Sequence, residues 1–237
     1  MSQDSSDQRS PDSRNNRELF LKTVRGALGH NPGAAPPRPE SRPMRDEACF
    51  REVAVDNPER VARWVERAKS NGMTVHRTDA AGINAAVNAI LSEQNIKSIM
   101  LNFSDGRLAP MGEFLQARAY QIHRWGEPDC AAMAFECDAA ITDCRYGMAD
   151  SGAFLVWSDA GFGRSTTLTI PLHIVLVPAS RILPDLIDAM PRILGDNAGQ
   201  MPSNVVVING PSKTGDIEMK LVTGVHGPKY LYAIVVD

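Results

Sequence analysis

The chain has 237 residues, of which 43% are hydrophobic, and a formal net charge of −3 at pH 7. This length allows one large domain or two small ones, with enough apolar residues for a core. The charge argues against sequence-independent binding of nucleic acid, which needs a basic face. No apolar run reaches the roughly 18 residues of a membrane helix. The polar N-terminus has no signal-peptide core, so we expect a cytoplasmic protein.

The N-terminal part of the chain is predicted to form an arm rather than part of the main domain. Residues 1–15 are almost entirely polar and are predicted to be disordered. Apolar residues then recur at helical spacing over 19–28, which predicts a short amphipathic helix that ends at Gly29. The proline-rich segment 31–39 is typical of a linker. The predicted organisation is a disordered tail over 1–15, a helix and linker over 16–43, and an α/β domain over 44–237.

Helices and strands are predicted to alternate along the domain. The helices are expected at 57–70, 80–91, 113–119 and 183–193. The strands are expected at 73–76, 99–103, 121–124, 139–142, 153–157, 173–177, 204–208 and 230–236. This alternation predicts a doubly wound α/β domain whose parallel or mostly parallel sheet is covered on both faces.

The densest group of polar residues follows the strand predicted at 204–208. Either Ser212 or Thr214 would cap a helix that has Asp216 in its first turn. A well-capped helix is a sufficient explanation of this pattern. The alternative is ligand binding beyond the carboxyl end of the strand, where Lys213 would contact an anionic group.

A second polar group lies in the segment between two predicted strands. Gly152 would allow a close approach of the backbone. Asp150 is a candidate polar site residue, and it is the only carboxylate that we can name as a nucleophile. Ser151 has no base beside it in the sequence, and a Ser-Gly pair is common in turns, so we interpret it as a turn residue that could contact a ligand.

Two further positions have both a functional and a structural interpretation. Arg164 follows a short glycine-containing loop and could bind a carboxylate through its guanidinium fork, or could be a solvated surface residue. His226 lies before the last strand and could relay a proton, although a lone histidine more often makes a structural hydrogen bond. The same holds for His173.

The cysteines do not suggest a metal site. Cys130, Cys137 and Cys144 are seven residues apart, and Cys49 is remote. Ligands of zinc and iron–sulfur clusters usually lie closer together on a loop. We therefore expect the cysteines to be buried apolar side chains and predict no metal ligands in this chain.

Together these segments resemble the lactate utilization protein C family of the LUD domain superfamily. The resemblance covers roughly residues 45–237, and the segments that carry it are 210–218, 224–228, 150–153, and Arg164 with 171–174. The chain departs from the family pattern in three places. Relatives usually have Glu-Thr-Gly-Thr where this chain has Asp-Ser-Gly-Ala at 150–153, Gly where Asp143 stands, and Ala where Gly215 stands.

The resemblance implies a fold like that of the sugar-phosphate isomerase and CoA-transferase group. This fold is a three-layer α/β sandwich with a mostly parallel sheet, here with an N-terminal helical arm. The resemblance also implies a component of an iron–sulfur system that oxidises L-lactate to pyruvate, rather than a complete enzyme. Partner subunits would carry the iron–sulfur clusters, and this chain alone would bind no cofactor. The alternative is a stand-alone transferase or ligase of the same fold that acts on an anionic substrate.

Our hypothesis for the site is a single polar pocket at the strand tips that binds a small carboxylate. Arg164 and Lys213 would bind the carboxylate group. The other expected ligand-binding residues are Ser151, Gly152, Ser212 and Thr214. The catalytic candidates, which would orient the ligand or relay a proton, are Asp150, Asp216 and His226.

Overall fold

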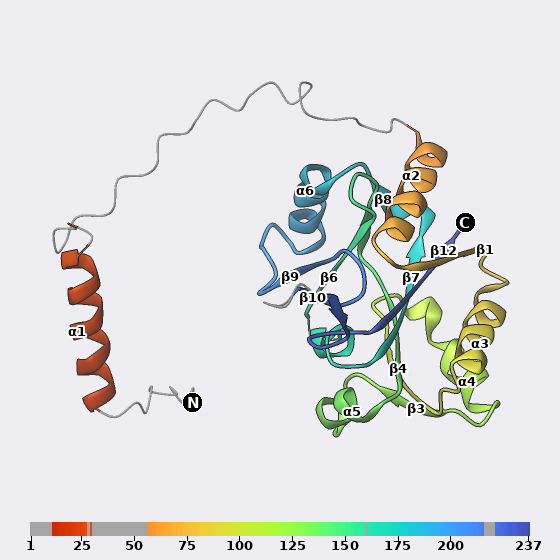
Figure 1. The fold of residues 1–237 in the computed structure, drawn as a ribbon, viewed down its shortest axis with the longest axis horizontal. Coiled ribbons are helices and arrows are strands. Elements are labelled where there is room, and N and C mark those ends of the chain that lie inside the picture. Colours follow the sequence, from red (N-terminus) through yellow and green to blue (C-terminus); the bar gives the residue numbers. More distant parts are fainter. Residues whose placement is uncertain (1–10, 28, 30–55, 160, 216–220) are drawn as a thin grey trace. The chain divides into compact units, whose positions relative to one another are not determined.

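The computed structural model describes residues 11–27, 29, 56–159, 161–215 and 221–237. The chain divides into two units, residues 1–51 and 52–237. The described part of the first unit contains helix α1 (Pro11–Ala27), drawn in red in Figure 1. This helix covers most of the segment predicted to be helical, and it begins within the segment predicted to be disordered. A proline at the first helical position lacks only an N–H that would have no partner within the helix. Residues 1–10 and the proline-rich linker lie outside the described residues.

The second unit is built on a six-stranded sheet, here called sheet A, with strand order β1-β12-β7-β4-β2-β3. All neighbouring strands in it are parallel. Its strands are β1 (Thr74–Thr78), β2 (Ser98–Asn102), β3 (Gln121–Arg124), β4 (Ala139–Asp143), β7 (Leu172–Pro178) and β12 (Tyr230–Val236). The central strands β4 and β7 are almost entirely buried, as expected when both faces of a parallel sheet are covered. The predicted α/β class with a mostly parallel sheet is confirmed.

A second sheet, here called sheet B, has four strands in the order β8-β5-β6-β9. These are β5 (Tyr146–Met148), β6 (Ala153–Trp157), β8 (Ile182–Leu183) and β9 (Val205–Ile208). β6 pairs antiparallel with both β5 and β9. The sequence predicts β6 and β9 but not this separate sheet, because β5 and β8 are too short to show a periodic pattern.

Helices cover the two sheets in layers (Figure 1). The helices are α2 (Asn57–Ser70), α3 (Ile83–Glu93), α4 (Pro110–Gln116), α5 (Cys130–Glu136) and α6 (Leu186–Asp196). α3 and α4 lie together on one face of sheet A, where Leu91 and Leu115 pack with Ile174. The steps from β1 to β2 and from β2 to β3 run in one direction across the sheet, so right-handed connections place both helices on the same side. Pro191 lies inside α6, which continues past the predicted end of that helix.

Sheet B and α2 cover the opposite face of sheet A. Trp64 of α2 and Phe154 of β6 are fully buried in one cluster with Val175 of β7. α6 in turn covers the outer face of sheet B, where Ile193 packs with Leu155. The order of layers is therefore α3 and α4, sheet A, sheet B with α2, and α6.

The segment after β9 forms a hairpin instead of the predicted helix. β10 (Lys213–Gly215) pairs antiparallel with β11 (Leu221–Thr223). Ser212 is also bound to the returning chain, because its N–H donates to the carbonyl of Pro228 at 2.9 Å. These long-range partners occupy backbone groups that a helix would need, so the helix predicted to begin at Ser212 or Thr214 is wrong. Asp216 lies outside the described residues.

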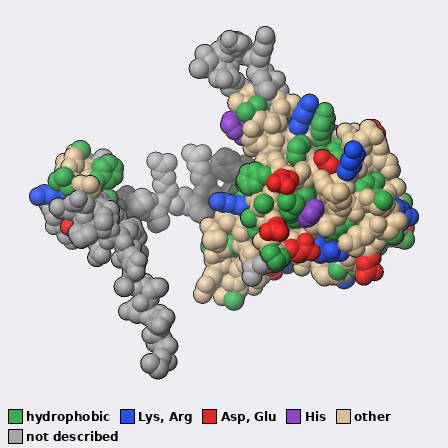
Figure 2. Space-filling view, turned by 90° about the horizontal axis from the view of Figure 1, so that it is seen from below, with side chains coloured by type: hydrophobic (Ala, Val, Ile, Leu, Met, Phe, Trp, Pro, Cys, Tyr) green, Lys and Arg blue, Asp and Glu red, His purple; other side chains and the backbone are tan. Residues whose placement is uncertain are grey.

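Side chains of both charge signs lie on the face of the molecule drawn in Figure 2. Figure 2, seen from below Figure 1, shows basic, acidic and hydrophobic side chains interspersed over the visible face. This distribution agrees with the formal net charge of −3. Within the described ranges, no helix is both long and apolar enough to cross a bilayer.

Candidate functional site

Two cavities open where the strands of sheet A end. This carboxyl edge is the usual ligand site of an open parallel sheet, because the loops that follow the strands diverge there. The large compartment has a volume of about 580 Å³ and lies over the ends of β4, β7 and β12. The small compartment has a volume of about 170 Å³ and lies over the ends of β2 and β3. Asp105 lines both, so the two compartments are neighbours.

The loop after β2 separates the compartments, and Asp143 at the end of β4 holds it. The Asp143 side chain is buried, and its carboxylate accepts three hydrogen bonds from this loop. The donors are the N–H of Ser104 at 2.8 Å, the Ser104 hydroxyl at 2.5 Å and the N–H of Asp105 at 3.0 Å. Asp143 therefore positions the loop rather than presenting a free carboxylate to either compartment.

Asp105 and Arg107 form an ion pair at the mouth of the large compartment. Their closest atoms, Arg107 Nη2 and Asp105 Oδ2, are 2.6 Å apart. The hydrogen bond from the Arg107 side chain, followed by the one from its N–H, holds the pKa of Asp105 at about 2. At neutral pH the Asp105 carboxylate therefore compensates the charge of Arg107.

Arg181 also lines the large compartment, but unlike Arg107 it has no ion pair with a carboxylate among the described residues. It ends the short helix η4 (Ala179–Arg181) that follows β7, and it is half-buried. Within the part of the chain that the structure describes, its side chain makes no ion pair or hydrogen bond. An unpaired arginine in a cavity wall is suited to an anionic group.

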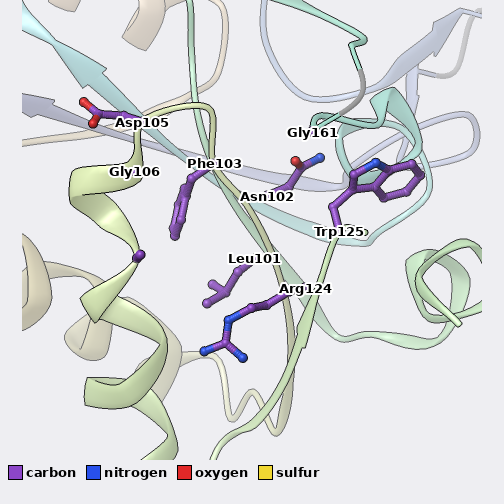
Figure 3. Close-up of a pocket in the computed structure, with 9 residues that line it drawn as sticks. Leu101, Asn102, Phe103, Asp105, Gly106, Arg124, Trp125 and Gly161 are labelled. Carbon is purple, nitrogen blue, oxygen red and sulfur yellow. The ribbon is translucent and has the colours of Figure 1, made fainter. Parts of the chain in front are cut away.

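Asn102, the last residue of β2, is the central polar residue of the small compartment (Figure 3). Only 1% of its surface is exposed. Its Nδ2 donates to the carbonyl of Gly163 at 3.0 Å and to the hydroxyl of Thr166 at 2.7 Å. Its Oδ1 is buried and has no hydrogen-bond partner among the described residues.

Two side chains at the end of β3 complete the small compartment. Trp125 lies against Gly163, where an added Cβ would come within 1.9 Å of the indole ring. Arg124 extends from the other side of the strand end (Figure 3). Its Nη1 is 4.0 Å from Glu127 Oε1, and 40% of its side chain is exposed. An ion pair of this length and exposure is weak, so the guanidinium is available to another anion.

Four of the nine site residues predicted from the sequence lie at the opposite, amino edge of sheet A. Asn71, just before β1, donates from Nδ2 to the carbonyl of Ser151 at 2.7 Å. Lys213 Nζ donates to the carbonyl of Asn71 at 2.6 Å. The N–H of His226, just before β12, donates to the hydroxyl of Ser212 at 3.2 Å. We call these five residues, Asn71, Ser151, Ser212, Lys213 and His226, the amino-edge cluster.

The other predicted residues are distributed around this cluster and the carboxyl edge. Thr214 lies in the hairpin, and Asp150 is an exposed turn residue whose N–H donates to the carbonyl of Pro184 at 3.0 Å. Gly152 is buried against the end of α2. Arg164 begins the short helix η3 (Arg164–Thr167) directly after Gly163, and is exposed beside the small compartment. None of these side chains lines either of the two compartments described above.

His173 has the structural role that its buried position favours. The side chain is fully buried in β7, and its Nε2 is 2.8 Å from the hydroxyl of Thr142. Burial lowers the pKa of His173 to about 3. The imidazole is therefore neutral at pH 7 and takes no part in the surface chemistry.

The cysteines pack as apolar side chains. Cys137 and Cys144 are buried, and Cys130 is partly buried. Burial raises the pKa of Cys137 to about 11 and also raises that of Cys144. In the described segments, no three His, Cys, Asp or Glu side chains group in a way that could hold a metal ion. Cys49 lies outside those segments.

Four polar residues of the carboxyl edge escape the sequence analysis. They are Asn102, Asp105, Arg124 and Arg181. Each lies at or just after the end of a strand that the sequence predicts, and in a parallel sheet these ends share one edge. Position after a predicted strand is therefore the signal that could have found them.

Comparisons with known proteins agree with this fold. The LUD domain family matches residues 61–236. Lactate utilization protein C 1 of Bacillus mycoides is 31% identical over 230 residues, which cover 94% of this chain and 97% of that protein. Lactate utilization protein C of Halalkalibacterium halodurans is 29% identical, with 93% of this chain and 97% of that protein covered.

A solved structure shows the same fold at lower sequence similarity. The crystal structure of a DUF162 family protein from Deinococcus radiodurans aligns with a TM-score of 0.57 and 18% identity, over 77% of this chain and 99% of that one. This likeness concerns the fold alone. The matches to the LUD domain and to full-length relatives show that the chain belongs to the LUD domain family and, within it, to the lactate utilization protein C family.

Proposed function

We propose that the chain is a component of a system that oxidises L-lactate to pyruvate with iron–sulfur partner proteins. The support is kinship with proteins named for lactate utilization, at about 30% identity over most of the chain. Oxidation of lactate releases electrons and protons, so an electron carrier is required. The proposal assigns that role to clusters on the partner proteins and assigns ligand binding to this chain.

The small compartment is the observation that carries the ligand-binding part of the proposal. A cavity volume of about 10–15 Å³ holds one water molecule. The volume of the small compartment, about 170 Å³, is therefore sufficient for a molecule the size of lactate. Arg124 supplies a cation whose present ion pair is weak. Leu101, Phe103 and Trp125 supply apolar wall for a methyl group (Figure 3).

Binding of L-lactate to variants of the full chain tests this assignment. Arg124→Ala is expected to weaken lactate binding by about tenfold or more, since hydrogen bonds to charged groups contribute about 1.5–3 kcal/mol. Arg118→Ala is the matched control, because Arg118 is exposed and packs on Phe114 outside both compartments. Equal affinity of the Arg124→Ala variant and the wild-type chain in calorimetric titration would contradict the assignment.

The role in a complex has a separate test. The tagged chain is expected to co-purify from its own cells with proteins whose absorption spectrum shows iron–sulfur clusters, and the complex is expected to oxidise lactate. A colourless chain that purifies alone and has its own turnover would count against the proposal.

The two carboxylate-binding residues predicted from the sequence do not share one pocket, because Lys213 lies in the amino-edge cluster and Arg164 lies beside the small compartment. The sequence predicts that Arg164 and Lys213 bind the carboxylate. Lactate oxidation by the complex with Arg164→Ala and with Lys213→Ala tests that prediction directly. Unchanged oxidation in both variants would show that it is wrong.

The large compartment favours a second candidate function, a transferase or ligase that acts on a larger anionic substrate. Its volume of about 580 Å³ exceeds what lactate needs and lies within the range of typical small-molecule sites. Arg181 lies in its wall and makes no ion pair among the described residues. Turnover of acyl-CoA or ATP by the isolated chain, lost in Arg181→Ala, would support this candidate.

A further inference from the structure

We propose that Asn102 makes the small compartment selective for a 2-hydroxy acid over the corresponding 2-oxo acid. In this proposal the Asn102 Oδ1 accepts a hydrogen bond from the substrate hydroxyl. The proposal rests on the function proposed above, because it takes its ligand class from the small carboxylate assigned to that compartment.

The contacts of Asn102 fix which end of its amide is the donor. Thr166 donates its hydroxyl proton to the carbonyl of Gly163 at 2.7 Å. Both groups that face the Asn102 Nδ2 therefore act as acceptors, namely the Gly163 carbonyl oxygen and the Thr166 hydroxyl oxygen. A flipped amide would place Oδ1 against these two oxygens. The amide is thus held with Nδ2 toward the 163–166 segment and Oδ1 on the other side.

This orientation leaves Oδ1 as a buried acceptor on a residue that lines the small compartment. Asn102 is 1% exposed, and its Oδ1 has no partner in the described part of the chain. Figure 3 shows the amide oxygen on the side of Phe103 and the amide nitrogen on the side of Trp125. A buried carbonyl oxygen without a hydrogen bond is unfavourable, so the site favours a ligand that brings a donor.

The two forms of the proposed substrate differ in this property. A 2-hydroxy acid has an O–H that can donate to Oδ1. A 2-oxo acid has only acceptor oxygens at the same carbon, so its carbonyl would face the Asn102 oxygen without a proton between them. Sites that hydrogen-bond a substrate hydroxyl reject analogues that lack it, because the buried protein group is then left unpaired.

A series of three ligands tests the proposal on the unmodified chain. L-lactate, pyruvate and propionate share a three-carbon carboxylate and differ in the hydroxyl. We expect L-lactate to bind more tightly than either of the others by roughly 5- to 150-fold, the range for one buried hydrogen bond. Calorimetric titration of the full chain measures the three dissociation constants.

Variants then locate the selectivity. Asn102→Ala is expected to bring the ratio of the pyruvate to the lactate dissociation constant close to one. Asn204→Ala, which removes a partly exposed amide in the loop before β9, is the matched control and is expected to keep the wild-type ratio. The ratio is informative because a general loss of structure would weaken both ligands together. If the Asn102→Ala variant does not fold, the three wild-type dissociation constants alone test the proposed selectivity.

The outcomes separate this proposal from the proposed function. Equal affinities for lactate and pyruvate in the wild-type chain would overturn the selectivity and leave the carboxylate site standing. A ratio that persists in Asn102→Ala would overturn the role of Asn102. Absence of binding by both acids would overturn the carboxylate site and the selectivity together.

Discussion

The two edges of sheet A use their polar groups differently. At the amino edge, Asn71 binds Ser151, Lys213 binds Asn71, and His226 binds Ser212, through contacts that each include a backbone group. At the carboxyl edge, the Asn102 Oδ1 lacks a partner among the described residues. Polar groups that satisfy one another stabilise a fold, whereas open polar groups in a cavity are available to a ligand. Ser151 Oγ at the amino edge is likewise buried without a partner among the described residues, but Ser151 lines neither compartment, so we expect the ligand at the carboxyl edge.

The largest expected effect tests the structural role of the amino edge. Gly152 has a φ of +70°, and an added Cβ would lie 2.3 Å from Ala68 N and 2.5 Å from the carbonyl carbon of Arg67. Both atoms belong to the backbone of α2, so neither can move aside cheaply. We expect Gly152→Val to lower the free energy of unfolding by at least about 3 kcal/mol, measured by urea denaturation.

A glycine without such neighbours is the control for this prediction. An added Cβ at Gly195, in α6, meets nothing within 4 Å. Gly195→Ala is expected to raise the free energy of unfolding by about 0.5–1 kcal/mol. If the Gly152 variant is as stable as this control, the amino edge does not hold the fold as we describe.

The next effect depends on pH and tests how well the amino edge excludes solvent. His173, the second residue of β7, has a pKa of about 3 in the folded chain because it is buried. An unfolded chain takes up this proton below about pH 6.5, while the folded chain does not. The free energy of unfolding therefore has its full value, as far as His173 is concerned, above pH 6.5, and it decreases as the pH falls toward 3. The expected loss is up to about 1.4 kcal/mol per pH unit.

Comparison with a variant isolates this contribution from that of the carboxylates. Between pH 6.5 and 4.5, the stability of His173→Gln is expected to fall less steeply with pH than that of the wild type. His76→Gln, which changes an exposed histidine, is expected to keep more of the wild-type slope. Identical slopes for His173→Gln and the wild type would show that His173 is accessible to protons in the folded state.

The smallest effect compares the edges most directly. Asn71 donates from its amide to the Ser151 carbonyl at 2.7 Å and to Asn209 Oδ1 at 2.6 Å. Asn71→Ala is expected to lower the free energy of unfolding by about 1–2 kcal/mol. We expect it to leave the dissociation constant of L-lactate unchanged in titration. Loss of lactate binding would instead place the ligand at the amino edge, near Lys213, which the sequence analysis names as a ligand-binding residue.

The sequence predicts the long elements of the fold well. The strand expected at 121–124 matches β3, and those expected at 153–157 and 230–236 match β6 and β12. Their apolar or alternating patterns are long enough to identify each strand separately. The hairpin of β10 and β11 could not be predicted in this way, because each of its strands has only three residues and shows no periodic pattern.

The site is less accessible to sequence reasoning for a reason of topology. The sequence analysis assumes that the polar residues after the strand at 204–208 lie at the ligand-binding edge of the parallel sheet. β9 belongs to sheet B, however, and its chain leads to the amino edge of sheet A. Asn102 escapes notice because its meaning depends on Gly163 and Thr166, which only the folded chain brings against its amide.

The loop after β2 separates the two compartments, and its hydrogen bonds to Asp143 fix its position. A ligand in either compartment could displace this loop only by breaking its hydrogen bonds to the buried Asp143 carboxylate. Such bonds contribute about 1.5–3 kcal/mol each, and breaking them would take up much of the binding free energy of a weakly bound small molecule. We therefore expect a ligand in one compartment to leave the shape of the other unchanged. The binding free energies of two ligands, one in each compartment, are then expected to add.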